Sequence, residues 1–412
     1  MALREWYADR ELLLTGVTSD LGRAVLEKIL RSFPSVKVYT VLRSRHGLDK
    51  EDRIKNIFMS PRFERIRQEV PDAISRVKAM EGNLVYDDLG VIKENRKLLQ
   101  NVSAVLHAAG PCQKLLEFCQ KLPRLEVIAV VSSVFEQEGE IGESNEEHVA
   151  DGPVALLKIP LIGPAYREPM PGFVDVLKGP TALIVGAGFA LGRSELRAEI
   201  IPIDLTVNSL ILAVWERATS KKNVKGAVVY NAAPIECTWG ELIKKGRRGN
   251  QKFTYPTFGL RGMTSVAKLH WILVLLFEWL PSAFCDTILG QLGAKKRLLE
   301  EQRRVRNALR SLESISSRSW SVERNRLYQV QQRLSPEEQD AFPVVTEIDI
   351  ESYVLCANAA AKKYCVEESN ITLMKILRLL FFFFIAVAFL SMLLFNRYRT
   401  SEIIKRRELE QL

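Results

Sequence analysis

The segment that most constrains the fold is 11–22, ELLLTGVTSDLG. A short apolar run enters a Thr-Gly turn, and the residues that follow carry apolar side chains at helical spacings of three and four. Strand, tight turn and helix in this order are typical of the first unit of a dinucleotide-binding fold, where the turn faces a pyrophosphate. Gly16 and Gly22 occupy the outer positions of a spaced-glycine loop, but Ser19 stands where the middle glycine is expected. A strand-to-helix turn that binds nothing is the alternative.

The second expected strand, over 36–42, ends in arginines instead of an acid. Arg43 follows it directly, and Arg45 comes two residues later. An acid at this place usually holds the ribose hydroxyls of NAD, whereas an arginine favours the phosphate of NADP. The pair therefore favours NADP, with a solvated strand end as the alternative interpretation.

The chain then alternates helical and strand patterns, which predicts an α/β fold with a Rossmann-type, doubly wound parallel sheet. A charged stretch over 51–70 predicts a pair of surface helices, and 115–120 predicts another helix. Further strands are expected at 77–80, 104–106, 127–131 and 154–159.

Composition narrows the class of protein. The 412 residues are 47% hydrophobic, enough for one large or two ordinary domains. The six cysteines form no C-x-x-C pair and have no partnering histidines, so no metal site and no disulfide framework are expected. The first residues, MALREWYADRE, lack an apolar stretch and do not resemble a secretory signal, so the front of the chain is expected in the cytosol.

Several short motifs occur in the order seen in one family. They are TGVTSDLG, VLRSRHG, SPRFERIRQEVP, MEGNL, LHAAG and VVSSV, followed by matching stretches at 152–188, 200–211 and 228–234 and by a helical tail over 295–366. In these motifs the chain resembles the alcohol-forming fatty acyl-CoA reductases, which belong to the extended short-chain dehydrogenase/reductases. The resemblance implies NADPH as cofactor and reduction of a long-chain fatty acyl-CoA, through an aldehyde, to a fatty alcohol.

The same resemblance assigns candidate site residues. Ser132 and Ser133 stand where the family places its catalytic Ser or Thr. The implied cofactor-binding residues are Thr15, Gly16, Thr18, Ser19, Leu21, Gly22, Arg43, Arg45, Asn83, Leu84, Ala108 and Ala109.

One part of the family's chemistry is missing from the sequence. The family needs a tyrosine that gives a proton to the carbonyl oxygen and a lysine one helical turn later, as Y-x-x-x-K. None of the ten tyrosines has a lysine four residues on. The helix that should carry the pair would lie within 134–153, and that stretch is acidic, glycine-containing and without an apolar stripe. It predicts a loop.

A second shortening follows LHAAG at 106–110, where the family has a longer segment. Both losses fall beside the expected active site. A true pseudoenzyme and an incomplete gene model explain them equally well. Two functions follow: an impaired fatty acyl-CoA reductase, or a catalytically inactive, membrane-tethered binding or scaffold homologue that pairs with itself or with an active relative.

Two other features resemble functional sites. The glycine spacing VGAGFALG at 185–192, after a strand expected at 183–185, is not followed by a clean apolar helix and is interpreted as a close-packed turn. His107 is interpreted as a hydrogen-bonded structural residue, with a catalytic base as the alternative.

The second half of the chain points to a membrane. Residues 269–280 are strongly apolar but end before Pro281, so they predict a buried helix or one dipping into a membrane face, and a lining for an acyl tunnel is the third option. Residues 293–312 predict a basic amphipathic helix that could rest on lipid headgroups; nucleic-acid binding lacks any supporting motif. Residues 376–395 predict a transmembrane helix flanked by basic residues.

These patterns divide the chain into four expected parts. They are a reductase domain over 1–240, an apolar helical linker over 241–294, the family's helical tail over 295–366 and the transmembrane helix over 376–395. The resemblance favours a C-terminal anchor in the endoplasmic reticulum or peroxisome, with the reductase domain facing the cytosol.

Overall fold

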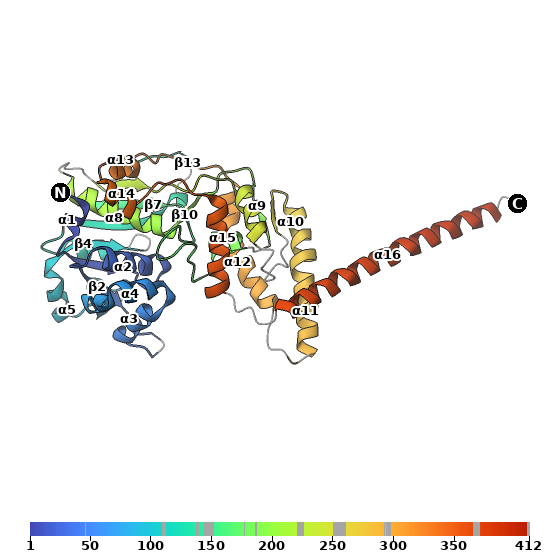
Figure 1. Ribbon diagram of the computed structural model, residues 1–412, viewed down its shortest axis with the longest axis horizontal. Helices are drawn as coiled ribbons and strands as arrows, with labels where there is room; N and C mark the ends of the chain where they lie inside the picture. Colours follow the sequence, from blue (N-terminus) through green and yellow to red (C-terminus); the bar gives the residue numbers. More distant parts are fainter. Residues whose placement is uncertain are drawn as a thin grey trace.

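The computed structural model describes most of the chain. The described residues are 1–45, 47–108, 113–136, 140–143, 152–176, 178–185, 188–220, 226–249, 261–291, 293, 298–365 and 371–409. Figure 1 shows an α/β body at the N-terminal end, a helical region beside it and one long helix that projects away.

A seven-stranded parallel sheet forms the body, in the order β11-β7-β5-β4-β1-β2-β3. Its strands are β1 (Glu11–Thr15), β2 (Lys37–Leu42), β3 (Val77–Glu81), β4 (Val102–His107), β5 (Val127–Ser133), β7 (Val154–Ile159) and β11 (Val228–Asn231). This confirms the Rossmann-type fold and each sheet strand expected up to residue 159. The chain reverses direction across the sheet between β1 and β4, which is where such folds bind ligands.

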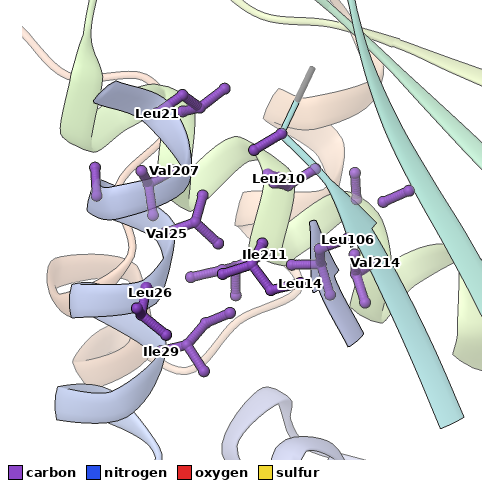
Figure 2. Close-up of a cluster of buried hydrophobic side chains, with 14 of the residues drawn as sticks. Leu14, Leu21, Val25, Leu26, Ile29, Leu106, Val207, Leu210, Ile211 and Val214 are labelled. Carbon is purple, nitrogen blue, oxygen red and sulfur yellow. The ribbon is translucent and has the colours of Figure 1, made fainter. Parts of the chain in front are cut away.

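Helices cover both faces of the sheet. The helices of the body are α1 (Leu3–Tyr7), α2 (Asp20–Ser32), α3 (Lys50–Met59), α4 (Glu64–Glu69), α5 (Lys93–Lys97), α6 (Gln113–Cys119) and α8 (Ile203–Thr219). On one face, α2 and α8 pack their apolar side chains against β1 and β4 (Figure 2), and these residues belong to the largest buried cluster. On the other face, α6 covers a second cluster. The paired surface helices expected over 51–70 are α3 and α4.

Short strands and further helices complete the chain. The strands are β6 (Glu140–Ile141), β8 (Leu161–Gly163), β9 (Phe189–Leu191), β10 (Ile200–Pro202), β12 (Gly262–Thr264) and β13 (Ser321–Val322). The helices are α7 (Gly179–Val185), α9 (Trp239–Gly249), α10 (Ala267–Val274), α11 (Leu280–Gln291), α12 (Leu298–Ser316), α13 (Arg326–Gln332), α14 (Pro336–Ala341), α15 (Ile350–Tyr364) and α16 (Ile371–Leu409).

Two expected boundaries were wrong. Residues 183–185 belong to α7 and not to a strand, because this segment packs its apolar side chains among α9, α12 and α15. The helix expected to end before Pro281 continues to Gln291, through a π-helical turn at Leu275–Trp279. In a π turn each carbonyl accepts a hydrogen bond from the N–H five residues later instead of four. The carbonyls before the proline can therefore find other N–H partners than in an α-helix, although proline itself has no N–H to donate.

Part of the expected tail returns to the sheet body. The segment β13 pairs in parallel with β6, and α13 packs against α8 and β11. Phe342 stacks on Phe33 of the body with ring centroids 5.6 Å apart. Residues of 327–344 therefore share the core of the first 240 residues, while the four-part division of the chain stays a prediction.

Candidate active site

The turn after β1 has the geometry of a dinucleotide loop. Gly16 adopts φ +84°, and a side chain there would press on the carbonyl of Ala108. A Cβ on Gly22 would collide with the Gly16 backbone, so the first turn of α2 approaches the loop as closely as glycine allows. The Ala108 N–H donates to Thr15 O at 3.2 Å, which ties β4 to the loop. Ala109 lies outside the described residues.

The helix end that would face phosphates is already capped. Ser19 is the N-cap of α2: its Oγ accepts the Gly22 N–H at 2.9 Å and donates to Gly16 O at 2.8 Å. The N–H groups of a first helical turn are the donors that hold a pyrophosphate in this fold. Thr18 is exposed and Leu21 is buried. The loop therefore keeps its shape, but one of its anion donors is satisfied internally.

An acidic side chain adds to this effect. Asp20, the first residue of α2, pairs with Arg23 at 2.5 Å and with Lys178 at 3.7 Å. Arg23 also pairs with Asp175 at 3.3 Å, and Asp175 with Arg62 at 3.1 Å. A carboxylate at a helix N-terminus is favourable for the helix but repels a bound phosphate. The pyrophosphate region thus fits a dinucleotide in backbone shape, and it places a carboxylate, paired with two cations, at the helix end that would face the phosphates.

The adenosine end of the site fits better. Arg43 and Arg45 are exposed at the end of β2, and Arg53 of α3 donates to Arg43 O at 2.5 Å. The pKa of Arg53 is lowered, first by partial burial and then by the charges of Arg45 and Arg43. Three arginines therefore gather where a 2′-phosphate would be held. Sequence reasoning missed Arg53, because only the fold brings α3 to the strand end.

The loop after β3 carries the other expected cofactor residues. Asn83 Oδ1 accepts the Val85 N–H at 3.2 Å, and the Asn83 N–H donates to Leu89 O at 2.7 Å. Leu84 is half-buried beside this turn. These contacts shape the turn after β3, and the role of both residues toward an adenine stays a prediction.

A row of buried polar side chains follows the carboxyl edge of the sheet. Thr15 of β1 lies opposite His107 of β4. His107 lies opposite Val130 of β5, and Ser132 comes two residues later on that strand. Ser132 lies opposite Lys158 of β7, which in turn lies opposite Asn231 of β11. Directly paired residues of parallel strands point to the same face, and all five side chains are buried. This is the edge at which such sheets bind their ligands. Lys158 and Asn231 were missed, although a lysine within the apolar run VALLKIP was a usable signal.

The two candidate serines point in different directions. Ser132 belongs to this row and donates to Glu136. Ser133 is paired with Ile159 on the opposite face, and its Oγ accepts the Phe135 N–H at 3.2 Å. Thr15 Oγ1 and His107 Nδ1 lie 2.7 Å apart, so the structural interpretation of His107 fits its buried hydrogen bond.

The described tyrosines do not supply a proton donor beside these serines. Buried hydroxyls are used elsewhere: Tyr7 donates to Ile211 O, and Tyr353 donates to Pro164 O. The Tyr230 hydroxyl donates to Glu216, and Tyr364 donates to the sulfur of Met170. Among the described residues, no tyrosine hydroxyl hydrogen-bonds to Ser132 or Ser133. Tyr255 and most of 134–153 lie outside the described part of the chain.

A cavity of about 270 Å³ lies next to the loop. Its walls come from the start of α2, from 162–164, from 173–176 and 178–181, from Arg62, from the first residue of α8 and from Ser311 of α12. This volume is slightly below the ~300–1,000 Å³ of typical small-molecule pockets. The cavity is therefore large enough for a compact headgroup rather than for a long chain.

Comparisons with known proteins agree with this architecture. Residues 14–155 match the NAD-binding model described as male sterility protein, and residues 277–368 match the sterile model with the same description. Fatty acyl-CoA reductase 1 of Mus musculus is 23% identical over 452 positions, covering 89% of this chain and 87% of that protein. Fatty acyl-CoA reductase 2 of Bos taurus is 24% identical over 88% of this chain and 86% of its own length.

A solved structure shares the fold. The reductase domain of a nonribosomal peptide synthetase from Mycobacterium tuberculosis aligns with a TM-score of 0.59 and 15% identity, over 86% of this chain and 91% of that domain. Sheet, loop and carboxyl-edge row together define a Rossmann-type reductase scaffold. With both family models in their expected order, the chain belongs to the fatty acyl-CoA reductase family.

The alignment also shows that the chain is shorter than the region of the relative that it matches. Since 89% of 412 residues is about 367, roughly 85 of the 452 aligned positions of the mouse relative have no counterpart here.

Proposed function

We propose that this chain is a fatty acyl-CoA reductase homologue that keeps the scaffold for NADPH and a long-chain fatty acyl-CoA but is impaired in the reduction itself. The fold and family models support a nicotinamide cofactor, and its relatives are named for reducing fatty acyl-CoA. Arg43, Arg45 and Arg53 favour NADPH over NADH, because together they offer charge to a 2′-phosphate.

The observation that carries the proposal is the absence of a Y-x-x-x-K pair from the sequence. Bound NADPH would supply the hydride, and a positioned acid must protonate the carbonyl oxygen as the hydride arrives. No tyrosine in the sequence has a lysine four residues on, and the described hydroxyls of Tyr7, Tyr230 and Tyr353 are used away from Ser132. Lys158 beside Ser132 can stabilise negative charge, but a lysine alone does not replace the tyrosine hydroxyl.

The intact core favours a second candidate, an inactive membrane-tethered binding or scaffold homologue. Every strand of the sheet forms although the crossover between β5 and β7 is short. Such a protein would bind acyl-CoA or pair with an active relative without turnover. The two candidates differ in whether any alcohol is made.

We also propose a C-terminal membrane anchor. By length and composition, Leu379–Thr400 within α16 is one of two segments in the described residues that could cross a bilayer. Seventeen residues of helix, Leu379–Phe395, span about 25 Å at 1.5 Å per residue, close to the ~30 Å hydrocarbon layer. An endoplasmic reticulum or peroxisomal membrane with the reductase domain in the cytosol fits a cofactor from the cytosolic pool.

The test compares this chain with an active relative. The full chain and mouse fatty acyl-CoA reductase 1 are each reconstituted in vesicles with NADPH and a long-chain acyl-CoA, and fatty alcohol and aldehyde are measured. We expect product from the mouse enzyme and little or none from this chain. Turnover comparable with that of the mouse enzyme would contradict the impairment. A separate titration follows NADPH and NADH binding by cofactor fluorescence, so that loss of binding is distinguished from loss of chemistry.

A further inference from the structure

The continuous helix Ala267–Gln291, formed by α10, the π turn and α11, turns polar side chains toward the protein and apolar side chains toward the outside. Three of its charged or polar residues point inward: Glu278 is fully buried, Ser282 is buried, and His270 is half-buried. In a soluble protein the polar side of a surface helix faces water and the apolar stripe faces the core. Here the polar side faces the protein.

Glu278 fixes this orientation. Its Oε1 accepts the Phe189 N–H at 2.7 Å, and its Oε2 accepts from Gln302 Nε2 at 2.7 Å and from the Arg306 guanidinium. Arg306 also donates to Phe189 O at 2.7 Å. His270 Nε2 lies 3.0 Å from the same carbonyl. The helix is therefore bound to β9 and α12 by a buried polar network in which the charge of Glu278 is paired.

The opposite side of the helix is apolar and exposed. Trp271 is 64% exposed, and the other exposed apolar residues beside it are Val266, Leu269, Ile272, Leu276 and Leu280. Lys268 is the one charged residue among the exposed positions of the described stretch 265–280. Soluble proteins rarely expose a continuous apolar surface of this kind, and such surfaces mark contacts with a partner or a membrane.

The position of the neighbouring helix α16 indicates what covers this surface. Figure 1 shows α10 and α11 as the outermost layer on the side from which α16 projects. Phe284 of α11 packs against Phe381 and Phe384 of α16, with ring centroids 5.4 and 6.2 Å apart. These two phenylalanines lie in the first turns of the apolar segment of α16, so α11 lies at the depth where that segment would enter the hydrocarbon layer.

We propose that Ala267–Gln291 lies flat in the membrane interface, with the stripe from Val266 to Leu280 in contact with lipid. This inference rests on the proposed anchor α16. Although the helix is long enough to cross a bilayer, crossing would carry Glu278, Arg306 and the backbone of β9 into hydrocarbon. Strand backbone and charges are not tolerated there when they face lipid, so the helix lies along the surface. The folded domain is thereby held against the bilayer by two elements instead of one.

The test places a fluorescent label at single sites of the full chain in phosphatidylcholine–phosphatidylserine vesicles. Leu276→Cys reports on the stripe, Phe389→Cys on the middle of α16, and Tyr328→Cys, an exposed site on α13, is the control. Quenchers are attached to the lipid either near the headgroup or at the chain end. We expect the label at 276 to lose emission with the shallow quencher, the label at 389 with the deep one, and the label at 328 with neither.

The outcomes separate the two proposals. A label at 276 that is not quenched, beside a quenched label at 389, overturns the flat helix and leaves the anchor in place. Stronger quenching of 276 by the deep quencher shows that the helix crosses and also overturns the inference. If 389 is not quenched either, the anchor fails and the flat helix fails with it. Leu276→Glu provides a second measurement: if the stripe contacts lipid, this variant reduces shallow quenching of a label at 272.

Discussion

Replacing Ser19 by glycine should strengthen nucleotide binding although it removes a helix cap. The Ser19 hydroxyl accepts the Gly22 N–H at 2.9 Å and donates to Gly16 O at 2.8 Å, at the end of α2 that would face a pyrophosphate. Without the serine side chain, the Gly22 N–H is free to donate to a phosphate, and no side chain stands between the loop and the phosphates. A hydrogen bond from a backbone N–H to a charged group contributes about 1.5–3 kcal/mol. At 1.4 kcal/mol per factor of ten, NADPH should bind roughly 10- to 150-fold more tightly.

The structural cost of the change is small and has a matched control. Exchanging an N-cap serine for glycine destabilises a helix by only a few tenths of a kcal/mol. Ser335 caps α14 with the same geometry, since its Oγ accepts the N–H of Glu338 three residues later, and it is also exposed. Ser335→Gly should therefore lower the melting temperature about as much as Ser19→Gly while leaving NADPH affinity unchanged.

Cofactor fluorescence titration gives the affinities, and thermal unfolding gives the melting temperatures. If Ser19→Gly and Ser335→Gly bind NADPH equally, the capped helix end is not what limits binding. The charge of Asp20, paired with Arg23 at 2.5 Å, would then be the better explanation, and Asp20→Asn would be the informative variant.

Three further changes test other parts of the structure. Arg43→Ala with Arg45→Ala should reduce NADPH affinity and leave NADH affinity unchanged; equal losses for both cofactors in titrations would contradict a 2′-phosphate site. Arg306→Met should lower the free energy of unfolding by about 3–5 kcal/mol, because it leaves Glu278 buried without its cation. The double variant with Glu278→Gln should recover most of this free energy, and denaturant unfolding measures both. Burial raises the pKa of the Cys237 thiol to about 12, so alkylation at pH 8, followed by mass spectrometry, should be slow until the protein is unfolded.

The sequence predicts the sheet body well because its signals are local. The apolar run before Gly16 and the stripe of α2 predict β1–α2, and the same alternation predicts the later strands. What it misses depends on distant contacts. Arg53 joins the two predicted arginines only because α3 folds back on β2, and β6 and β13 are two residues each and pair across 180 positions of sequence.

The errors have a local physical cause as well. A proline usually ends a helix, and Pro281 does not, because a π turn precedes it and Glu278 and His270 bind the residues before it to β9. The basic helix over 293–312 is α12 in the described residues, but its apolar positions Leu309 and Leu312 are buried against other helices. Its apolar face is therefore not available to lipid, which moves the expected membrane contact to the neighbouring helix.

The shortened crossover raises the question of what holds its remainder in place. Glu143, just after β6, accepts the N–H groups of Asn325 and Arg326 at 3.2 and 2.8 Å. The Arg326 guanidinium donates to Val229 O of β11 at 2.6 Å and to Glu143 O at 3.0 Å. The tail thus binds the crossover to the edge strand of the sheet.

Arg326→Met should therefore weaken the fold around the crossover. Losing two charge-assisted hydrogen bonds to backbone carbonyls should cost about 3–6 kcal/mol and increase protease cleavage between β5 and β7. Arg333→Met, directly after the same helix, is the control, because Arg333 is about half exposed and its ion pair with Glu216 is 3.5 Å long, so the change should cost less than ~0.5 kcal/mol. Equal cleavage rates in both variants would show that the crossover does not depend on the tail. A higher rate in Arg326→Met alone would show that the described part of the crossover is held in place by a segment about 180 residues downstream.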